Sequence, residues 1–167
     1  MSPLRRWRPW TWVTYLLSKR SEVAALDYKD AYMGKVIMDI HRLRSDKAQA
    51  MVPLRALHPI HGIDRESALQ ATRARAQALS ARRDELLAHG RLDLAALNEI
   101  IPSVSQIKVV QDGERWLAFE GNGRLYAMRE AFGEDCALLV EVEQYRFARP
   151  HKIQRRLRRI RRLNALE

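Results

Sequence analysis

The chain has 167 residues, of which 47% are hydrophobic and 30% are charged, and its formal net charge is +10. This length accommodates one folded domain with short extensions, and the hydrophobic content excludes a wholly disordered chain. The single cysteine, Cys136, excludes an intrachain disulfide framework and favours a reducing, cytoplasmic location, and no apolar run is long enough to span a bilayer.

The N-terminal segment combines positive charge with a short apolar run. The first 20 residues carry a net charge of +5, and Trp10–Leu17 is apolar apart from two threonines. We expect an amphipathic helix over residues 10–30 that packs on the body, with binding to a membrane surface as the less favoured alternative. A cleaved signal peptide is not favoured, because no clear small-residue cleavage site follows the apolar run. Residues 1–45 are therefore predicted to form a basic helical extension.

Strand-like and helical runs follow in turn. Val36–Ile40 and Met51–Leu57 are predicted strands, the second ending at His58-Pro59 because proline disfavours a helical conformation in the residue before it. The composition and the absence of glycine and proline predict one long helix over residues 65–89.

Capping residues set the expected ends of the helices in this region. Asp64 is the predicted N-cap of the long helix, and Gly90 is its predicted stop. A second, shorter helix is expected over residues 92–100, where Pro102 ends it.

The clearest β signal lies in the second half of the chain. Residues 106–111 and 115–120 flank an Asp-Gly-Glu turn, which predicts a β-hairpin. After a glycine-containing break, a helix is expected over residues 124–132, ended by Gly133. A further strand is expected over residues 137–145.

The break between the hairpin and this helix is a candidate phosphate-binding site. Free backbone N–H groups at a helix start point outward, glycines let a phosphate approach the backbone, and an arginine supplies a forked cationic contact. The alternative is that the glycines serve only the geometry of the turn. The residues of this corner are Gly121, Asn122, Gly123 and Arg124.

The order of the elements resembles the ParB/sulfiredoxin superfamily over residues 51–145. Its signature is a strand followed by a Gly-x-x-Arg-x-x-Ala helix, matched here by Gly121, Arg124 and Ala127. Val52–Pro59 resembles the first strand of that superfamily. In sulfiredoxins a reactive cysteine follows the first glycine of the motif, and because this chain has asparagine there, sulfiredoxin activity is not expected.

The resemblance implies a fold, a ligand and further site residues. The implied fold is α+β, with a small mixed sheet and packed helices over residues 46–148, and terminal amphipathic helices flank it. The implied cofactor is a nucleotide with Mg²⁺, whose phosphates would contact Arg124. Asp64 and Arg65 would face the same pocket.

An enzyme on the same fold is the first alternative. Glu120, beside the glycine turn, or Asp64 could act as a general base in a phosphotransferase or nucleotide hydrolase, although a solvated strand end also explains Glu120. His58 and His61 are too few to form a metal site, so no protein metal site is predicted.

The C-terminal residues 149–167 are predicted to form a basic amphipathic helix. Its apolar residues recur at Ile153, Leu157, Ile160 and Leu163, and residues 146–167 carry a net charge of +8. We expect its arginines to bind nucleic-acid phosphates with little sequence specificity. These arginines are Arg155, Arg156, Arg158, Arg159, Arg161 and Arg162.

The leading hypothesis is therefore a bacterial ParB-like nucleotide-binding protein that associates with nucleic acid through its basic termini. The apolar stripe of the last helix could pack on the body, on a second copy in a homodimer, or less favourably on a lipid surface. A non-catalytic adaptor for a protein or a membrane surface is the remaining alternative.

Overall fold

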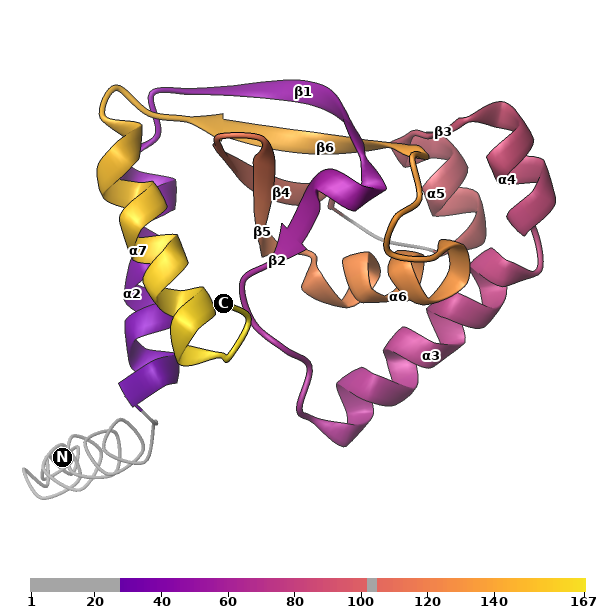
Figure 1. Cartoon of the computed structure of the whole chain (residues 1–167), viewed down its shortest axis with the longest axis horizontal. Helices are drawn as coiled ribbons and strands as arrows, with labels where there is room; N and C mark the ends of the chain where they lie inside the picture. The colour runs from indigo at the N-terminus through magenta and orange to yellow at the C-terminus, as the bar shows by residue number, and fades with distance from the viewer. Residues whose placement is uncertain (1–27, 102–104) are drawn as a thin grey trace, which may run out of the picture.

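The computed structural model describes residues 28–101 and 105–167. The strands of its central sheet are β1 (Asp46–Pro53), β2 (Leu57–Pro59), β3 (Arg91–Leu92), β4 (Ile107–Asp112), β5 (Arg115–Glu120) and β6 (Leu139–Arg146). They form one mixed sheet in the order β1-β6-β4-β5-β2, and β3 also pairs with β6 (Figure 1). The β1–β6 and β4–β5 pairs are antiparallel, whereas β4–β6, β2–β5 and β3–β6 are parallel.

Helices pack on both faces of this sheet. They are α2 (Tyr28–Leu43), α3 (Glu66–Ser80), α4 (Arg83–His89), α5 (Leu94–Ile100), α6 (Asn122–Phe132) and α7 (Pro150–Leu163), and the short 3-10 turn η1 (Leu54–Ala56) joins β1 to β2. Helices α2 and α7 lie side by side at one end of the molecule, and α3 to α6 lie toward the other (Figure 1). The predicted α+β fold with a small mixed sheet is confirmed.

The alternation of side chains along β5 divides the core into two clusters. Ala118 faces a cluster that includes residues of α3, α5 and α6, whereas Leu117 and Phe119 face a cluster that includes residues of α2 and α7. This division follows from the strand geometry, since successive side chains point to opposite faces of a sheet.

Several elements that were predicted from turn and glycine residues are present in the structure. The hairpin is β4 and β5, with Gly113 at φ 65° in the turn, and Gly90 caps α4 in the left-handed conformation. Helix α6 begins at Asn122, directly after Gly121, and ends before Gly133. Glycine is the residue that adopts positive φ without steric cost.

The strand predicted over Val36–Ile40 is wrong, because this run lies inside α2. Its β-branched residues suggested a strand, but Val36 and Ile40 are buried four residues apart, on one helical face. Of the helix predicted over residues 10–30, only residues 28–30 are described, and they begin α2. The rest of that prediction lies outside the described residues. So does Pro102, the predicted end of the helix over residues 92–100.

The single helix predicted over residues 65–89 is two helices, α3 and α4. Arg82 leaves the helical conformation, with φ −116° and ψ 19°, and its guanidinium pairs with Glu85 in the first turn of α4. The predicted N-cap Asp64 is also wrong: Arg65 occupies that position, without a side-chain capping bond. The second helix begins later than predicted, at Leu94, because Asp93 caps it by accepting a hydrogen bond from Ala96 N.

The strand predicted over Met51–Leu57 is interrupted. Residues 51–53 end β1, η1 follows, and Leu57 opens the short edge strand β2. Among the described residues, no helix has the length and apolar character needed to cross a membrane.

Helix α7 is packed into the body through its apolar stripe. Ile153, Leu157 and Ile160 are buried in the cluster that contains Phe119 and Tyr145, and Leu163 is 39% exposed. The stripe therefore packs on the body, which is one of the three placements considered from the sequence.

Candidate functional site

The chain turns from β5 into α6 at Gly121, where only glycine fits comfortably. Gly121 has φ 88°, and a Cβ atom there would lie 3.1 Å from Cα of Ile107. The carbonyl of Gly121 accepts from the amides of Arg124 and Leu125. The amides of Asn122 and Gly123, at the very start of the helix, have no acceptor within it.

The side chain of Asn122 has a structural partner. Asn122 is buried, and its Oδ1 accepts a hydrogen bond of 3.2 Å from the amide of Ile60. Of the predicted phosphate-binding residues, Asn122 can therefore offer a ligand its backbone amide while its side chain holds the segment that follows β2.

Arg124 lies beneath the corner, and part of its guanidinium is unpaired. The residue is 9% exposed, and its Nη2 donates to Ser105 Oγ at 3.2 Å and to the Gln106 carbonyl at 3.5 Å. Its Nη1 is buried without a hydrogen-bond partner in the described part of the chain. Burial, together with the neighbouring Arg75 guanidinium, lowers the pKa of Arg124.

Arg75 of α3 reaches the same helix start and was not predicted from the sequence. A Cβ atom built on Gly123 would lie 3.3 Å from Arg75 Nη1 and 3.5 Å from Thr72 Oγ1. Arg75 makes no hydrogen bond or ion pair within residues 28–101 and 105–167. Two guanidinium groups therefore converge on the first turn of α6, which is itself the positive end of the helix dipole.

A hollow of about 330 Å³ opens at this point. Gly123, Thr72 and Arg75 form part of its wall. Asp64 and Arg65 also line it, so the structure brings these two predicted residues together with Gly123, whereas Gly121, Asn122 and Arg124 are not part of its lining. Lys29 and Asp30 of α2 complete its charged lining, which totals three cations and two carboxylates among the described residues.

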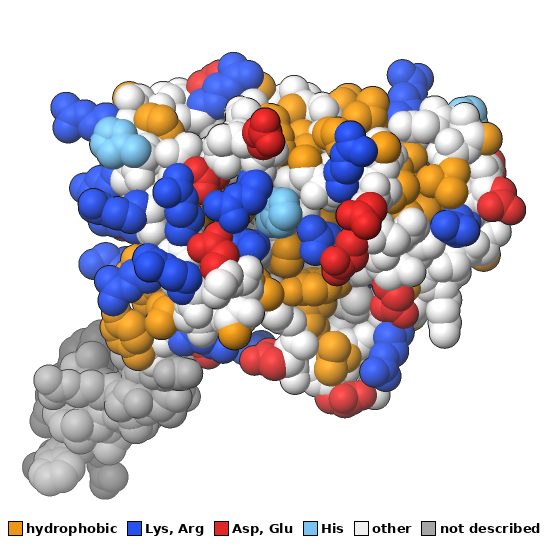
Figure 2. Space-filling model, in the orientation of Figure 1, with side chains coloured by type: hydrophobic (Ala, Val, Ile, Leu, Met, Phe, Trp, Pro, Cys, Tyr) orange, Lys and Arg blue, Asp and Glu red, His pale blue; other side chains and the backbone are white. Residues whose placement is uncertain are grey.

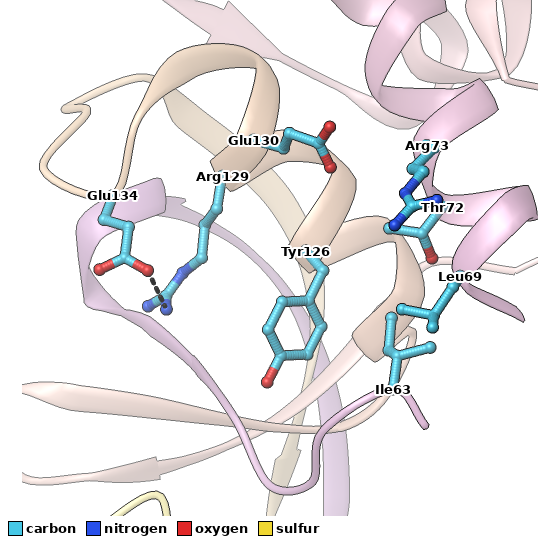
Figure 3. Close-up of a pocket in the computed structure, with 8 residues that line it drawn as sticks. All are labelled: Ile63, Leu69, Thr72, Arg73, Tyr126, Arg129, Glu130 and Glu134. Carbon is cyan, nitrogen blue, oxygen red and sulfur yellow. Dashed lines mark ion pairs between the residues drawn. The ribbon is translucent and has the colours of Figure 1, made fainter. Parts of the chain in front are cut away.

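A second hollow, of about 470 Å³, lies between α3 and α6 and shares Ile63 and Thr72 with the first. Figure 3 shows the Tyr126 ring between the apolar side chains of Ile63 and Leu69 on one side and the Arg129–Glu134 ion pair on the other. The first hollow therefore has a partly charged lining, and the second, next to it, has a partly apolar lining.

Glu120, a candidate general base, has both carboxylate oxygens engaged. Oε1 accepts from His41 Nε2 at 2.6 Å, and Oε2 accepts from Lys108 Nζ at 2.5 Å. Burial alone would raise the pKa of Glu120, but the hydrogen bonds from Lys108 and His41 outweigh it and lower the pKa. Glu120 therefore ties α2 to the sheet, and neither oxygen can accept a substrate proton without disturbing one of these two hydrogen bonds.

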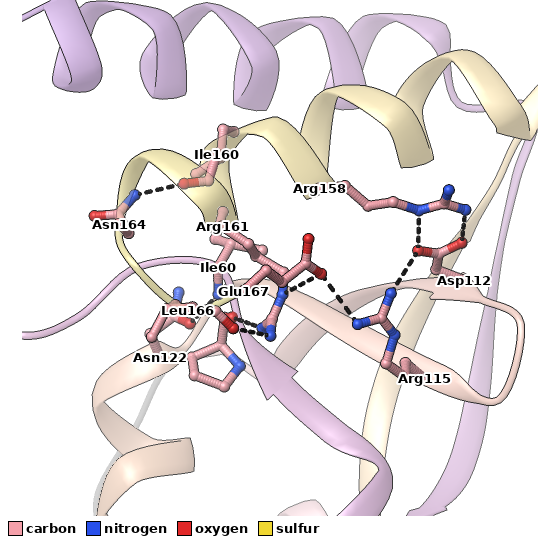
Figure 4. Close-up of polar contacts among 11 residues, drawn as sticks. Ile60, Asp112, Arg115, Asn122, Arg158, Ile160, Arg161, Asn164, Leu166 and Glu167 are labelled. Carbon is pink, nitrogen blue, oxygen red and sulfur yellow. Dashed lines mark hydrogen bonds and ion pairs between the residues drawn. The ribbon is translucent and has the colours of Figure 1, made fainter.

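Three of the predicted nucleic-acid-binding arginines are held by internal partners. Arg158 binds Asp112 through two hydrogen bonds of 2.7 and 2.6 Å, and Arg156 pairs with Asp39 of α2. Arg161 is buried and donates to the Pro59 carbonyl. Figure 4 shows how this end of α7 is fixed on the hairpin, through Arg158, and on the last residue of β2, through Arg161.

The other three predicted arginines of α7 form no ion pair with an acidic side chain in the described part of the chain. Arg159 donates to the Tyr28 hydroxyl at 3.0 Å and stacks over the Tyr32 ring, so it packs on α2. Arg155 and Arg162 are exposed and make no hydrogen bond or ion pair in the described part of the chain. The sequence predicted nucleic-acid contacts from all six arginines, whereas in the structure Arg156, Arg158 and Arg161 are engaged within the protein.

The edge strand β2 carries a histidine that should make folding sensitive to pH. Burial, and then the charges of Arg129 and Arg161, lowers the pKa of His58 to about 4. The unfolded chain binds this proton near pH 6.5, so stability is full above that pH and falls as the pH drops toward 4. Because His58 is only half-buried, solvent screening reduces the effect, and we expect a loss of roughly 1–2 kcal/mol over this range.

Urea unfolding at neutral pH and at mildly acidic pH tests this expectation. The difference between the two unfolding free energies should be smaller in His58→Gln than in the native protein, and His151→Gln, on the exposed start of α7, serves as the control. An unchanged pH dependence in His58→Gln would show that other groups cause it.

Within the described residues, no group of three His, Cys, Asp or Glu side chains is placed to hold a metal ion. Comparisons of the chain with protein-family models, with curated proteins and with solved structures gave no match.

Proposed function

We propose that the chain binds the phosphate groups of a nucleotide at the first turn of α6. One observation carries this proposal: Arg124 is more than nine-tenths buried, its Nη1 has no partner among the described residues, and it lies with Arg75 at the start of the helix. An unpaired buried nitrogen of a guanidinium is costly, because the charge has lost water without gaining a partner.

A bound phosphate would offset the cost of burying this guanidinium. It would place negative charge next to two guanidinium groups that otherwise repel each other, and it would accept from the free amides of Asn122 and Gly123. Guanidinium groups suit this ligand because they donate two parallel hydrogen bonds to phosphate oxygens. Gly123 leaves the space, since any side chain there would meet Arg75 and Thr72.

The adjoining hollow favours a nucleotide over free phosphate. The Tyr126 ring and the apolar side chains of Ile63 and Leu69 provide a surface for a planar base next to the charged hollow. The proposal agrees with what the resemblance to the ParB/sulfiredoxin superfamily implies, and membership of that superfamily is part of the proposal. Mg²⁺ fits only as an ion carried by the phosphates, with Asp64 and Asp30 as nearby oxygen donors.

A thermal-shift screen with CTP, ATP, ADP and GTP, each with Mg²⁺, tests this proposal. A ligand that binds only the folded state raises the melting temperature, and at 100 times Kd it adds about 2.7 kcal/mol of stability. We expect at least one nucleotide to raise it by several degrees, and Arg75→Ala to lose most of that shift. Arg83→Ala, an exposed arginine of α4 away from the hollow, should keep it.

Two results would contradict the proposal: no shift with any nucleotide, or an equal loss of the shift in Arg75→Ala and Arg83→Ala. The second would mean that net charge, and not this corner, governs the interaction.

A further inference from the structure

The ends of four elements meet at one corner of the molecule. The amide of Ser45, between α2 and β1, donates to the carbonyl of Arg146 at the end of β6, at 2.8 Å. Helix α7 runs antiparallel to α2, because Arg156 pairs with Asp39 while Arg159 reaches Tyr28. The start of α7 therefore lies beside the end of α2, the start of β1 and the end of β6.

Cations dominate the corner where these ends meet. Figure 2 shows Lys and Arg side chains concentrated over the α7 side of the molecule. We call this set the basic corner: Arg42, Arg44, Lys47, Arg146, Arg149, Lys152 and Arg155. Each of these residues is exposed, and no acidic side chain stands in the first turn of α7.

The acids nearby neutralise only part of this charge. Lys47 pairs with Glu143 at 2.9 Å, Arg42 with Asp39 at 3.1 Å, and Arg146 approaches Asp46 at 3.7 Å. Arg149, Lys152 and Arg155 make no hydrogen bond or ion pair within the described residues.

The side of α7 that faces the hairpin shows the opposite arrangement. There Asp112 and Glu167 pair with Arg158 and Arg161, so the chain supplies counter-charges where arginines serve the fold. The basic corner gathers cations on a surface without a matching number of acids, which creates a positive potential suited to a polyanion.

We propose that the basic corner binds the sugar-phosphate backbone of a nucleic acid. Five of its seven cations are arginines, and guanidinium groups recognise phosphate by paired hydrogen bonds. A membrane surface fits less well, because a helix that binds lipid needs a free apolar face, and the apolar stripe of α7 is buried in the core. Contacts from four elements to the backbone give affinity with little sequence preference.

The test compares two triple variants that remove the same charge. The first, R149A/K152A/R155A, removes the unpaired cations of the basic corner. The control, R55A/R83A/R91A, removes exposed arginines of η1, α4 and β3, away from the basic corner, that make no side-chain hydrogen bond or ion pair in the described chain (Figure 1). Circular dichroism checks that both variants fold.

Binding to a fluorescent DNA duplex is measured over a series of salt concentrations. We expect the corner variant to bind at least about tenfold more weakly at low salt, with a salt slope lower by about 0.9 for each phosphate that is no longer neutralised. The control should stay within about twofold of the native protein.

Three outcomes would overturn the proposal. The first is that the native protein fails to bind the duplex. The second is that the two variants lose affinity for the duplex equally. The third is that the native protein binds anionic phosphatidylserine vesicles and not DNA. The last outcome would assign the basic corner to a membrane surface.

Discussion

Replacing Leu157 by alanine is expected to lower the free energy of unfolding by about 2–5 kcal/mol. Leu157 is fully buried at the centre of α7, in the cluster that also contains Ile40, Phe119 and Tyr145. Truncation removes buried methyl groups and leaves a cavity between the helix and the sheet. Urea unfolding followed by circular dichroism measures the destabilisation, which should affect the single transition of the whole domain.

Leu163→Ala is the matched control, since Leu163 lies in the same apolar stripe but is 39% exposed. Its effect should stay near about 0.5 kcal/mol, as for surface substitutions. If Leu157→Ala leaves the main transition unchanged, α7 is an appendage and not a part of the domain core.

Gly121→Ala is expected to destabilise the protein by about 1–3 kcal/mol, the range for backbone strain at one residue. At φ 88° an alanine is strained, and its Cβ would lie 3.1 Å from Cα of Ile107, a backbone atom that cannot rotate away. Thermal unfolding of the variant measures this destabilisation.

Gly123→Ala separates this backbone requirement from ligand binding. Its Cβ would meet only the ends of side chains, namely Arg75 Nη1, Thr72 Oγ1 and Ile63 Cδ1, and a helical position favours alanine over glycine. We therefore expect its stability to stay within about 1 kcal/mol of the native protein. Equal destabilisation by the two alanines would contradict the assignment of the strain to Gly121.

Features encoded by neighbouring residues could be predicted from the sequence. The Asp-Gly turn identified the hairpin, left-handed glycines ended α4 and preceded α6, and the spacing of Ile153, Leu157 and Ile160 identified the buried side of α7. Each of these depends on backbone conformation or periodicity within a few residues.

The misplaced elements depended on tertiary packing. Val36–Ile40 has a strand-like composition but lies inside α2, where Val36 and Ile40 are buried in the cluster that also contains residues of α7 and the sheet. Residues 65–89 have helical propensity throughout, and the break at Arg82 carries no glycine or proline to mark it. Packing routinely overrides such local preferences.

Only part of the candidate site could be predicted from the sequence. Gly121 and Arg124 stand in one local motif, but Arg75 comes from α3, almost fifty residues earlier, and reaches the same helix start only after folding. Nor did the sequence indicate that Asp39 and Asp112 would neutralise Arg156 and Arg158, because each pair is distant along the chain. As a result, three of the six predicted arginines, Arg156, Arg158 and Arg161, are engaged inside the protein.

Binding of a phosphate at the first turn of α6 can be followed residue by residue in an NMR titration. The ¹⁵N-labelled protein is titrated with the nucleotide that gives the largest shift in the thermal screen. We expect the amide signals of Asn122 and Gly123 to move most, together with the side-chain signal of Arg75, and Gly123→Ala to abolish these changes. Movement confined to residues of the basic corner, or no movement at the start of α6, would contradict phosphate binding there.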